Sequence, residues 1–515
     1  MENTDYYEFV DTTNGNLDKS WLLFACVILL FATYIYLWLV RRPSHFSKCY
    51  TLVKIPLLGN KWGLRRPGSA ETEFHSAASI FENVGSTFIA WRWNKPIVFV
   101  ADATNVQKIL SQPSQLERGR YGLQECEWMV GKGLLTSQGK VWKSDRKTLT
   151  QSFHRSKMIT NHLPIFHRGS EALMANLQNM ENSDETISVD IEQLVNEATF
   201  SNMFESIFGI RPEPDENIVE RYFTASKLGD QVTRVRVMKP YISAVPILWK
   251  LFGHADKQEF VLKSVKDLLM PRILERQRLL QTDPDADGGL LCDAFFKTET
   301  NLEVLFHHVV SLFIAGSDTT TNLVVHTLHQ LALNPSIQAD VLDELDAVFS
   351  DKESMHQVET GHLAELKLLE RCMKETLRLY PPASTTSRKL VEGIVLDDGT
   401  KLESGCEVRI FMCLLHQNPN YFTNPETFDP DRFLPENCAS RHPYAYIPFA
   451  MGPRNCVGNR YAMDEAKILL VQILGQFRVA SCQRGVDHKE PAFKLNFTLQ
   501  TLNPIMLALT RREST

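Results

Sequence analysis

The longest apolar stretch of the chain lies near its N-terminus, over residues 21–40, where no side chain is charged. A helix of this length spans about 30 Å, the thickness of the hydrocarbon core of a bilayer. Residues 1–20 are acidic, whereas Arg41 and Arg42 follow the stretch directly. Because positively charged flanks stay in the cytosol, the pattern predicts a single-pass anchor with residues 1–20 in the lumen. No basic region precedes the stretch, which argues against a cleaved signal peptide.

After this stretch the pattern changes to that of a globular protein. Residues 41–60 contain turn-forming proline and glycine and are predicted to be a connector to one large domain, residues 61–515. Two short apolar runs between positions 86 and 101 predict a hairpin of two strands. Residues 142–154 and most of 155–280 have helical periodicity. The chain is therefore predicted to be mainly α with a small β region.

A long helix is predicted over residues 301–334, because its apolar rhythm continues until just before Pro335. At its centre, residues 315–320 are poor helix formers. The Thr319 hydroxyl can donate to the carbonyl of Ala315, four residues back, and bend the helix. We expect a local opening there, with room for a small molecule and for water.

A second apolar segment, residues 241–252, is rich in aromatic side chains and interrupted by Pro246. Two interpretations stay open. The segment dips into a membrane surface as an entrance for an apolar molecule, or it is part of the buried core.

Composition limits the classes of function. Hydrophobic residues make up 43% and charged residues 23%, as in ordinary globular proteins. The net charge of -6 and the lack of a basic block argue against nucleic acid as a partner. The ten cysteines form no C-x-x-C pair, so neither a zinc module nor a disulfide framework is indicated, and the large domain is expected in a reducing compartment.

The strongest candidate chemistry lies in the segment 449–458, Phe-Ala-Met-Gly-Pro-Arg-Asn-Cys-Val-Gly. The sulfur of Cys456 precedes a helical sequence, whose N-terminal dipole favours thiolate over thiol. Gly452 and Gly458 stand where the chain turns tightly or approaches another group. Arg454 is spaced to reach an anionic group on a cofactor rim. A free buried cysteine is the alternative for an isolated Cys, and the fixed spacing of its neighbours argues against it.

These residues resemble the haem-ligand signature of the cytochrome P-450 family, which the sequence matches at Phe449, Gly452, Arg454, Cys456 and Gly458. The resemblance implies the cytochrome P-450 fold and haem b, bound without a covalent link, with Cys456 as the axial iron ligand. Residues 61–515 would then form a haem-thiolate catalytic domain.

Further motifs of the same family follow in the expected order. By resemblance, Thr319 would hydrogen-bond to dioxygen on the distal side of the haem, and Asp318 would relay protons to it. Trp142 and Arg146, one helical turn apart, would donate to one haem propionate, and Arg388 to the second. A structural clamp for folding and haem retention is implied for three more residues: Glu375, Arg378 and Arg432.

The anchor and these motifs look most like microsomal members near the fatty-acid ω-hydroxylase branch. That branch often carries a glutamate where Ala315 stands. Since this glutamate can esterify the haem, no covalent attachment is expected here. Ala450 stands where glycine or serine is commoner, and its small size is expected to be tolerated.

The resemblance implies a monooxygenase of the endoplasmic reticulum membrane that inserts one oxygen atom from dioxygen into a lipophilic substrate. Electrons would come from NADPH through a separate flavoprotein reductase, since the chain has no nucleotide-binding fingerprint, with cytochrome b5 as a second candidate partner. Two alternatives are an isomerase or dehydratase that acts on peroxides without external electrons, and a membrane scaffold without turnover. The substrate's identity stays open.

Overall fold

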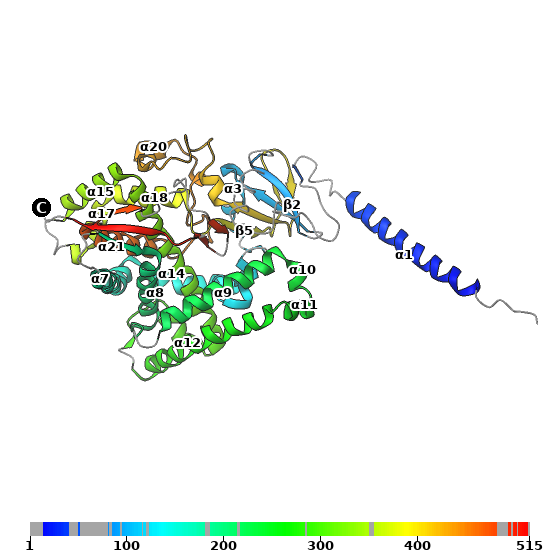
Figure 1. Cartoon of the computed structure of the whole chain (residues 1–515), viewed down its shortest axis with the longest axis horizontal. Helices are drawn as coiled ribbons and strands as arrows, with labels where there is room; N and C mark the ends of the chain where they lie inside the picture. The colour runs from blue at the N-terminus through cyan, green and yellow to red at the C-terminus, as the bar shows by residue number, and fades with distance from the viewer. Residues whose placement is uncertain are drawn as a thin grey trace, which may run out of the picture.

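The structure, a computed structural model, describes residues 14–40, 50–51, 81, 85–92, 95–115, 117–119, 123–180, 186–213, 217–283, 286–349, 355–481, 493–495, 498–501 and 503–512. Of the predicted tail and connector, residues 1–13, 41–49 and 52–60 lie outside this set. Helices make up most of the described residues, and the largest sheet lies at one side of the molecule (Figure 1). The predicted class, mainly α with a small β region, is confirmed.

The helices of the described chain are, in order, α1 (Asn14–Val40), α3 (Ala103–Leu110), α4 (Glu127–Val130), α5 (Gly139–Thr150), α6 (Arg155–Lys157), α7 (Leu163–Asn179), α8 (Ile191–Phe208), α9 (Ile218–Met238), α10 (Pro240–Ser243), α11 (Pro246–Leu251), α12 (His254–Thr282), α13 (Asp293–Thr298), α14 (Leu302–Leu333), α15 (Pro335–Val348), α17 (Thr360–Glu365), α18 (Lys367–Leu379), α19 (Met412–His416), α20 (Pro435–Ala439) and α21 (Asn459–Gln476). A π-helical turn, Met158–His162, leads into α7.

The strands form a five-stranded sheet, a three-stranded sheet and two hairpins within the described residues. The largest sheet has the order β1 (Tyr50–Thr51), β2 (Thr87–Arg92), β3 (Lys95–Val100), β8 (Glu407–Phe411) and β5 (Thr385–Lys389). The predicted hairpin is confirmed, because β2 and β3 pair antiparallel with Thr87 opposite Val100. The remaining strands are β4 (Thr186–Asp190), β12 (Met506–Arg511) and β9 (Phe477–Ser481) in one sheet, and the pairs β6 (Ile394–Val395) with β7 (Lys401–Leu402) and β10 (Phe493–Leu495) with β11 (Leu499–Thr501).

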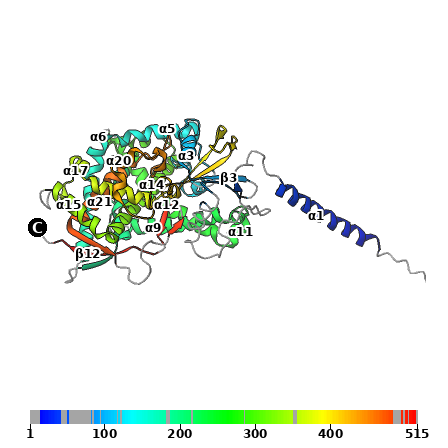
Figure 2. The same ribbon diagram turned by 90° about the horizontal axis from the view of Figure 1, so that it is seen from above.

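Helix α14 runs through the centre of the helical part (Figure 2) and contacts α8, α12, α18 and α21. The Asn301 side chain caps its first turn by accepting hydrogen bonds from the N–H groups of Glu303 and Val304. The helix ends at Leu333, because Pro335 begins the next one. The long helix predicted over residues 301–334 is therefore confirmed within one residue at each end.

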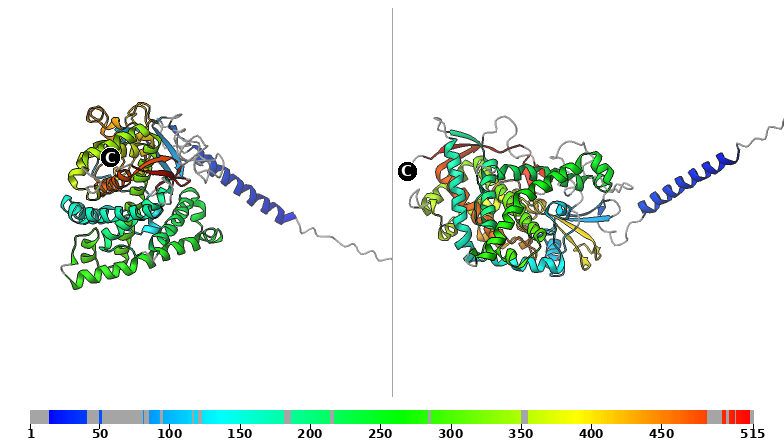
Figure 3. Two further views of the ribbon diagram at one scale, coloured as in Figure 1. Left: turned by 60° about the vertical axis from the view of Figure 1, so that its left-hand side comes forward. Right: turned by 90° about the horizontal axis from the view of Figure 1, so that it is seen from below.

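Helix α1 projects away from the globular part, next to the side that carries the five-stranded sheet (Figures 1 and 3). Its apolar side chains from Trp21 to Leu30 are exposed. Within the ranges given above, none of the helices combines the length and the hydropathy needed to cross a bilayer. The anchor predicted over residues 21–40 stays a prediction.

The apolar segment 241–252 lies at the surface on α10, α11 and the turns beside them. Ile247 and Leu251 are 78% and 75% exposed, whereas among the described side chains of this segment Ile242 and Trp249 are buried and Leu248 packs against them. Burial in the core, one of the two interpretations left open by the sequence, is therefore wrong for most of this segment.

Candidate functional site

The Cys456 loop, residues 449–458, is closed by backbone hydrogen bonds. The N–H of Cys456 donates to the Phe449 carbonyl over 2.8 Å, and the N–H of Asn455 donates to Gly452 over 3.1 Å. Gly452 has φ +78°, and a Cβ there would lie 1.9 Å from the Leu110 carbonyl oxygen. Both the backbone angle and the close approach require glycine at this position.

Gly452 and Gly458 differ in whether the structure requires a glycine. Gly458 has an ordinary φ of -93°, and a Cβ there would meet nothing nearer than Phe153, at 3.6 Å. The described protein atoms therefore do not demand glycine at 458. Its role in this structure is to cap α21 and to donate its N–H to the Cys456 sulfur.

Ala450 occupies the left-handed region with φ +54°. The small size of alanine is therefore not the deciding property here, because the backbone angle makes glycine the better fit. We expect Ala450→Gly to raise the free energy of unfolding by up to about 1 kcal/mol, because it removes the strain that a Cβ causes at positive φ. Ala462→Gly, inside α21, is the control and should lower stability by about 1 kcal/mol. Denaturant unfolding of the two variants measures both effects, and equal losses in both would contradict the strain at Ala450.

The Cys456 thiol has an accessible side chain, although protein atoms crowd around it. Burial raises its pKa, and the Gly458 N–H, Arg146 and Arg118 lower it by less, so the pKa lies above its ordinary value. Protein groups alone thus favour the thiol, contrary to the expectation from the helix dipole. A thiolate at this position requires a bound metal ion, which deprotonates a coordinating thiol outright.

Three arginines gather beside this loop: Arg118, Arg388 on β5 and Arg454 in the loop itself. Burial and mutual repulsion lower the pKa of Arg388 to about 9 and that of Arg454 to about 8. Burial likewise lowers the pKa of Arg118 to about 10. Over the described part of the chain, neither Arg118 nor Arg388 forms an ion pair, and the buried Nε of Arg118 has no hydrogen-bond acceptor. Such a cluster fits the carboxylate edge of an anionic cofactor.

Helix α5 supports the cluster with the two side chains predicted one turn apart. Trp142 is buried and stacks against Arg454, whose guanidinium carbon lies 4.6 Å from the ring centroid. Its indole N–H has no acceptor among the described residues, and it is therefore available to a cofactor. The Arg146 guanidinium instead donates to Asn455, to its backbone carbonyl oxygen over 2.7 Å and to its side-chain oxygen over 3.0 Å. Arg146 thus holds the Cys456 loop, and a bond from it to a propionate stays a prediction.

On α14 the Thr319 hydroxyl donates to the carbonyl of Ala315 over 2.7 Å, which confirms the predicted bond. The helix nevertheless continues unbroken through this turn. The expected opening is instead a group of half-buried residues in this part of the helix, of which Ala315, Thr319 and Asn322 share one face. Burial raises the pKa of Asp318 to about 7, aided by Asp230 and Glu192 and opposed by Lys227.

The predicted clamp forms as three contacting side chains. Arg378 makes a bidentate pair with Glu375, with bonds of 2.7 and 2.8 Å, and Arg432 approaches the same carboxylate at 3.3 Å. Both Glu375 and Arg378 are 0% exposed. Arg378 also donates to the carbonyls of His416 and Thr427, which ties α18 to the segments that lead to the Cys456 loop.

Two residues of the site, Arg118 and Gln138, belong to no sequence motif. Arg118 lies in a stretch without a motif, so only its place beside Arg388 and Arg454 reveals it. Gln138 accepts from the Arg118 N–H over 3.0 Å and from Arg454 over 2.9 Å, and it thereby connects two of the three arginines. Nothing in the local sequence indicates either contact.

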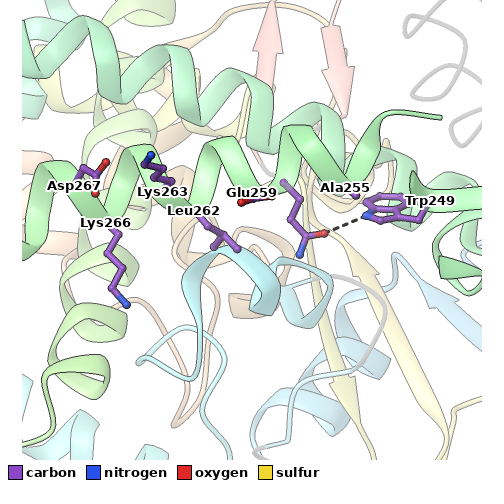
Figure 4. Close-up of a pocket in the computed structure, with 8 residues that line it drawn as sticks. Trp249, Ala255, Glu259, Leu262, Lys263, Lys266 and Asp267 are labelled. Carbon is purple, nitrogen blue, oxygen red and sulfur yellow. Dashed lines mark hydrogen bonds between the residues drawn. The ribbon is translucent and has the colours of Figure 1, made fainter. Parts of the chain in front are cut away.

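A surface pocket of about 650 Å³ lies apart from these residues, on α11 and α12 (Figure 4). Its walls combine the apolar faces of Trp249 and Leu262 with charged side chains: Glu259, Lys263, Lys266 and Asp267. It shares no residue with the Cys456 loop or the arginine cluster.

Comparison with known proteins agrees with this geometry. A model of the family described as Cytochrome P450 matches residues 51–508. Cytochrome P450 4p1 of Drosophila melanogaster is 29% identical over 457 residues, which cover 84% of this chain and 85% of that protein. Cytochrome P450 4V2 of Mus musculus is 30% identical over 442 residues, 82% of each chain. Cytochrome P450 4V2 of Pongo abelii is 29% identical over 504 residues, 94% and 92% of the two chains.

Proposed function

The chain belongs to the cytochrome P450 family, whose members are haem monooxygenases, and on that premise we propose that it oxidises a lipophilic substrate with electrons from NADPH. A separate flavoprotein reductase would deliver them, with cytochrome b5 as a second candidate donor. The family-4 names of its relatives agree with the ω-hydroxylase branch expected from the sequence. The observation that carries the proposal is the accessible Cys456 sulfur beside three clustered arginines.

Haem b fits this arrangement. The Cys456 sulfur would hold the iron, while Phe449 and the glycines shape the loop around it. The propionates would lie beside Arg118 and Arg388, which form no ion pair within the described residues, and next to Trp142 and Arg454. Ala315 offers no carboxylate for an ester bond, so the haem would be held without a covalent link. When bound, the haem supplies the redox chemistry that activates dioxygen.

Two residues of α14, Asp318 and Thr319, would handle protons for the bound haem. Because the pKa of Asp318 is raised to about 7, its carboxyl group exists in both protonation states near neutral pH and can give and regain a proton. The Thr319 hydrogen is committed to the Ala315 carbonyl, so its oxygen is left to accept a hydrogen bond. Thr319 Oγ1 would therefore accept a hydrogen bond, and Asp318 would supply a proton.

We expect Asp318→Asn to lower the rate of NADPH-dependent substrate oxidation by about a hundredfold, the usual contribution of a positioned acid. The wild-type rate should fall as pH rises through about 7, because the protonated carboxyl is lost, and the variant should lack this step. Asp287→Asn, at an exposed carboxylate, is the control. A rate that is unchanged in Asp318→Asn would favour the alternative, an isomerase or dehydratase of peroxides, which needs no proton relay.

The membrane association rests on two exposed apolar surfaces. The side chains of α1 from Trp21 to Leu30 have no protein cover, and neither do Ile247 and Leu251 of α11. Soluble proteins rarely leave so much apolar surface in water. We therefore keep the assignment of residues 21–40 as anchor in the endoplasmic reticulum membrane, with residues 1–20 in the lumen and the catalytic domain, residues 61–515, in the cytosol.

The proposal is tested with the full chain in microsomes. The reduced protein with carbon monoxide should give the absorption band of a thiolate-ligated haem. Addition of reductase and NADPH should then consume oxygen when lipophilic compounds are present. A missing thiolate band would contradict the haem site, and a band without oxygen consumption would favour a non-oxidative role.

A further inference from the structure

Helix α8 is buried on nearly all sides, yet it carries a row of polar side chains. Thr199, Asn202 and Ser206 are spaced three and four residues apart, and each is almost completely buried. Buried polar groups destabilise a protein unless they find partners. Each member of this row has a partner on α14 or α21, the two helices that carry the candidate chemistry.

Thr199 connects the row to α14. Its hydroxyl lies 2.7 Å from that of Thr321 and 3.4 Å from that of Ser317. Ser317 directly precedes Asp318 and Thr319. Through these bonds α8 holds the turn of α14 whose side chains would manage protons.

Ser206 connects the other end of the row to α21. Its hydroxyl lies 2.9 Å from the Tyr461 hydroxyl. The Tyr461 ring meets Phe153 edge to face, with the centroids 6.1 Å apart. Phe153 in turn lies against Gly458, whose N–H donates to the Cys456 sulfur. Contacts thus lead from the row on α8 to the predicted iron ligand.

Asn202, in the middle of the row, forms a pair with Glu465. The Asn202 amide N–H donates to Oε1 of Glu465 over 2.8 Å. Among the described residues, neither Oε2 of Glu465 nor Oδ1 of Asn202 has a hydrogen-bond partner, and both atoms are buried. Gly169 leaves room for this amide, because a Cβ there would lie 1.9 Å from Oδ1. The pair therefore contains two buried oxygens without a bond, and one added hydrogen between them would satisfy both.

We propose that Glu465 is protonated in the native protein, that its Oε2–H donates to Oδ1 of Asn202, and that this acid–amide pair positions α21 and therefore the Cys456 sulfur. The added proton gives both unfilled acceptors a bond. Glu465 is then a positioning residue for Cys456. This second part rests on the proposed function, whereas the protonation itself does not.

The charges around the pair agree with a neutral acid. Burial raises the pKa of Glu465 to about 8, and the bond from Asn202 opposes this only in part. Glu465 acts on Tyr461, which is on the same helix, and Glu205 on α8 and His162 before α7 lie next to Tyr461. Burial raises the pKa of Tyr461 and lowers that of His162 to about 4, so both are neutral at pH 7. None of these groups offers a positive charge to stabilise the carboxylate.

The protonation predicts how stability depends on pH. Between pH 4.5, the ordinary pKa of a glutamate, and about 8, the folded chain keeps a proton that the unfolded chain releases. Stability should therefore fall as pH rises through this window and level off above it. Glu465→Gln keeps the donor as an amide N–H and cannot ionise, so it should lack this fall.

The first experiment compares thermal unfolding of the full-length wild type and Glu465→Gln from about pH 6 to about pH 9. The midpoint of the variant should exceed that of the wild type by an amount that grows until about pH 8 and then stays constant. A difference that does not change with pH would overturn the protonation.

The second experiment follows the thiolate band of the reduced, carbon monoxide-bound haem. Glu465→Gln should keep the wild-type band, whereas Glu465→Leu should raise the ratio of thiol-ligated to thiolate-ligated haem about tenfold, the factor for one lost buried hydrogen bond. Asp293→Asn is the control, because it weakens a different buried contact, the ion pair with Arg276. Asp293→Asn should lower the midpoint of thermal unfolding and leave the thiolate band unchanged.

The outcomes separate the two claims. A wild-type band in Glu465→Leu, with a lowered midpoint, would overturn the positioning role. If Glu465→Leu does not fold, Asn202→Ala removes the same bond from the α8 side, and a wild-type band in that variant would overturn the positioning role instead. A wild type without any thiolate band would contradict the proposed function, and the pH experiment would still decide whether Glu465 carries a proton.

Discussion

Replacement of Cys456 by serine is expected to abolish the thiolate band and to lower substrate oxidation by about a hundredfold or more, since even the loss of a group that only orients a metal ligand costs 10- to 100-fold. A hydroxyl is a harder and far weaker donor to iron than a thiolate, and it cannot push electron density toward the metal. The loop itself should survive, because Gly452 and the backbone bonds of Phe449 and Asn455 hold its shape.

Cys438→Ser is the matched control, because Cys438 is exposed and lies outside the Cys456 loop. Its band, haem content and turnover should equal those of the wild type. Absorption spectra and turnover with reductase and NADPH measure both variants. If Cys456→Ser kept the wild-type band and rate, the sulfur would not be the iron ligand, and the haem site described above would be wrong.

Glu375→Ala is expected to lower the free energy of unfolding by about 3–5 kcal/mol, the effect of removing one partner from a buried ion pair. Arg378 would keep its positive charge in a fully buried position, where the carbonyls of His416 and Thr427 and the Phe422 ring offset it only in part. Arg432 and the N–H of Asp429 would lose the same carboxylate. Because these segments lead to the Cys456 loop, the variant should also retain less haem.

Glu275→Ala gives the comparison at the surface. Glu275 pairs with Arg272 over 3.2 Å, but the Glu275 side chain is 62% exposed. Glu275→Ala should therefore lower the free energy of unfolding by less than about 1 kcal/mol. Denaturant unfolding and haem content should be measured for both variants. Equal losses would mean that the buried clamp contributes no more than a surface pair.

Several features follow from the sequence because their physical cause is local. The Thr319 bond to Ala315 joins residues one helical turn apart, so helical geometry alone brings them together. Glu375 and Arg378 likewise share one helix face. Gly452 needs a positive φ that the tight loop demands. Sequence analysis also found the β2–β3 hairpin and the limits of α14 for this reason.

Other features depend on contacts between distant segments. Arg118, Arg388 and Arg454 come from separate parts of the chain, and no local pattern shows that they meet. The same applies to the row on α8, whose partners on α14 and α21 lie more than a hundred residues away. The sequence suggested that a helix dipole would favour the Cys456 thiolate, but it could not show how strongly burial opposes this.

The amino-acid sequence by itself therefore determined the family, the helical class and the residues whose chemistry depends on near neighbours. Tertiary structure alone decided which charges share a buried space, which acceptors lack a hydrogen and how far each pKa moves. The reason is that desolvation and charge interaction depend on every atom within several ångströms, whatever its distance along the chain.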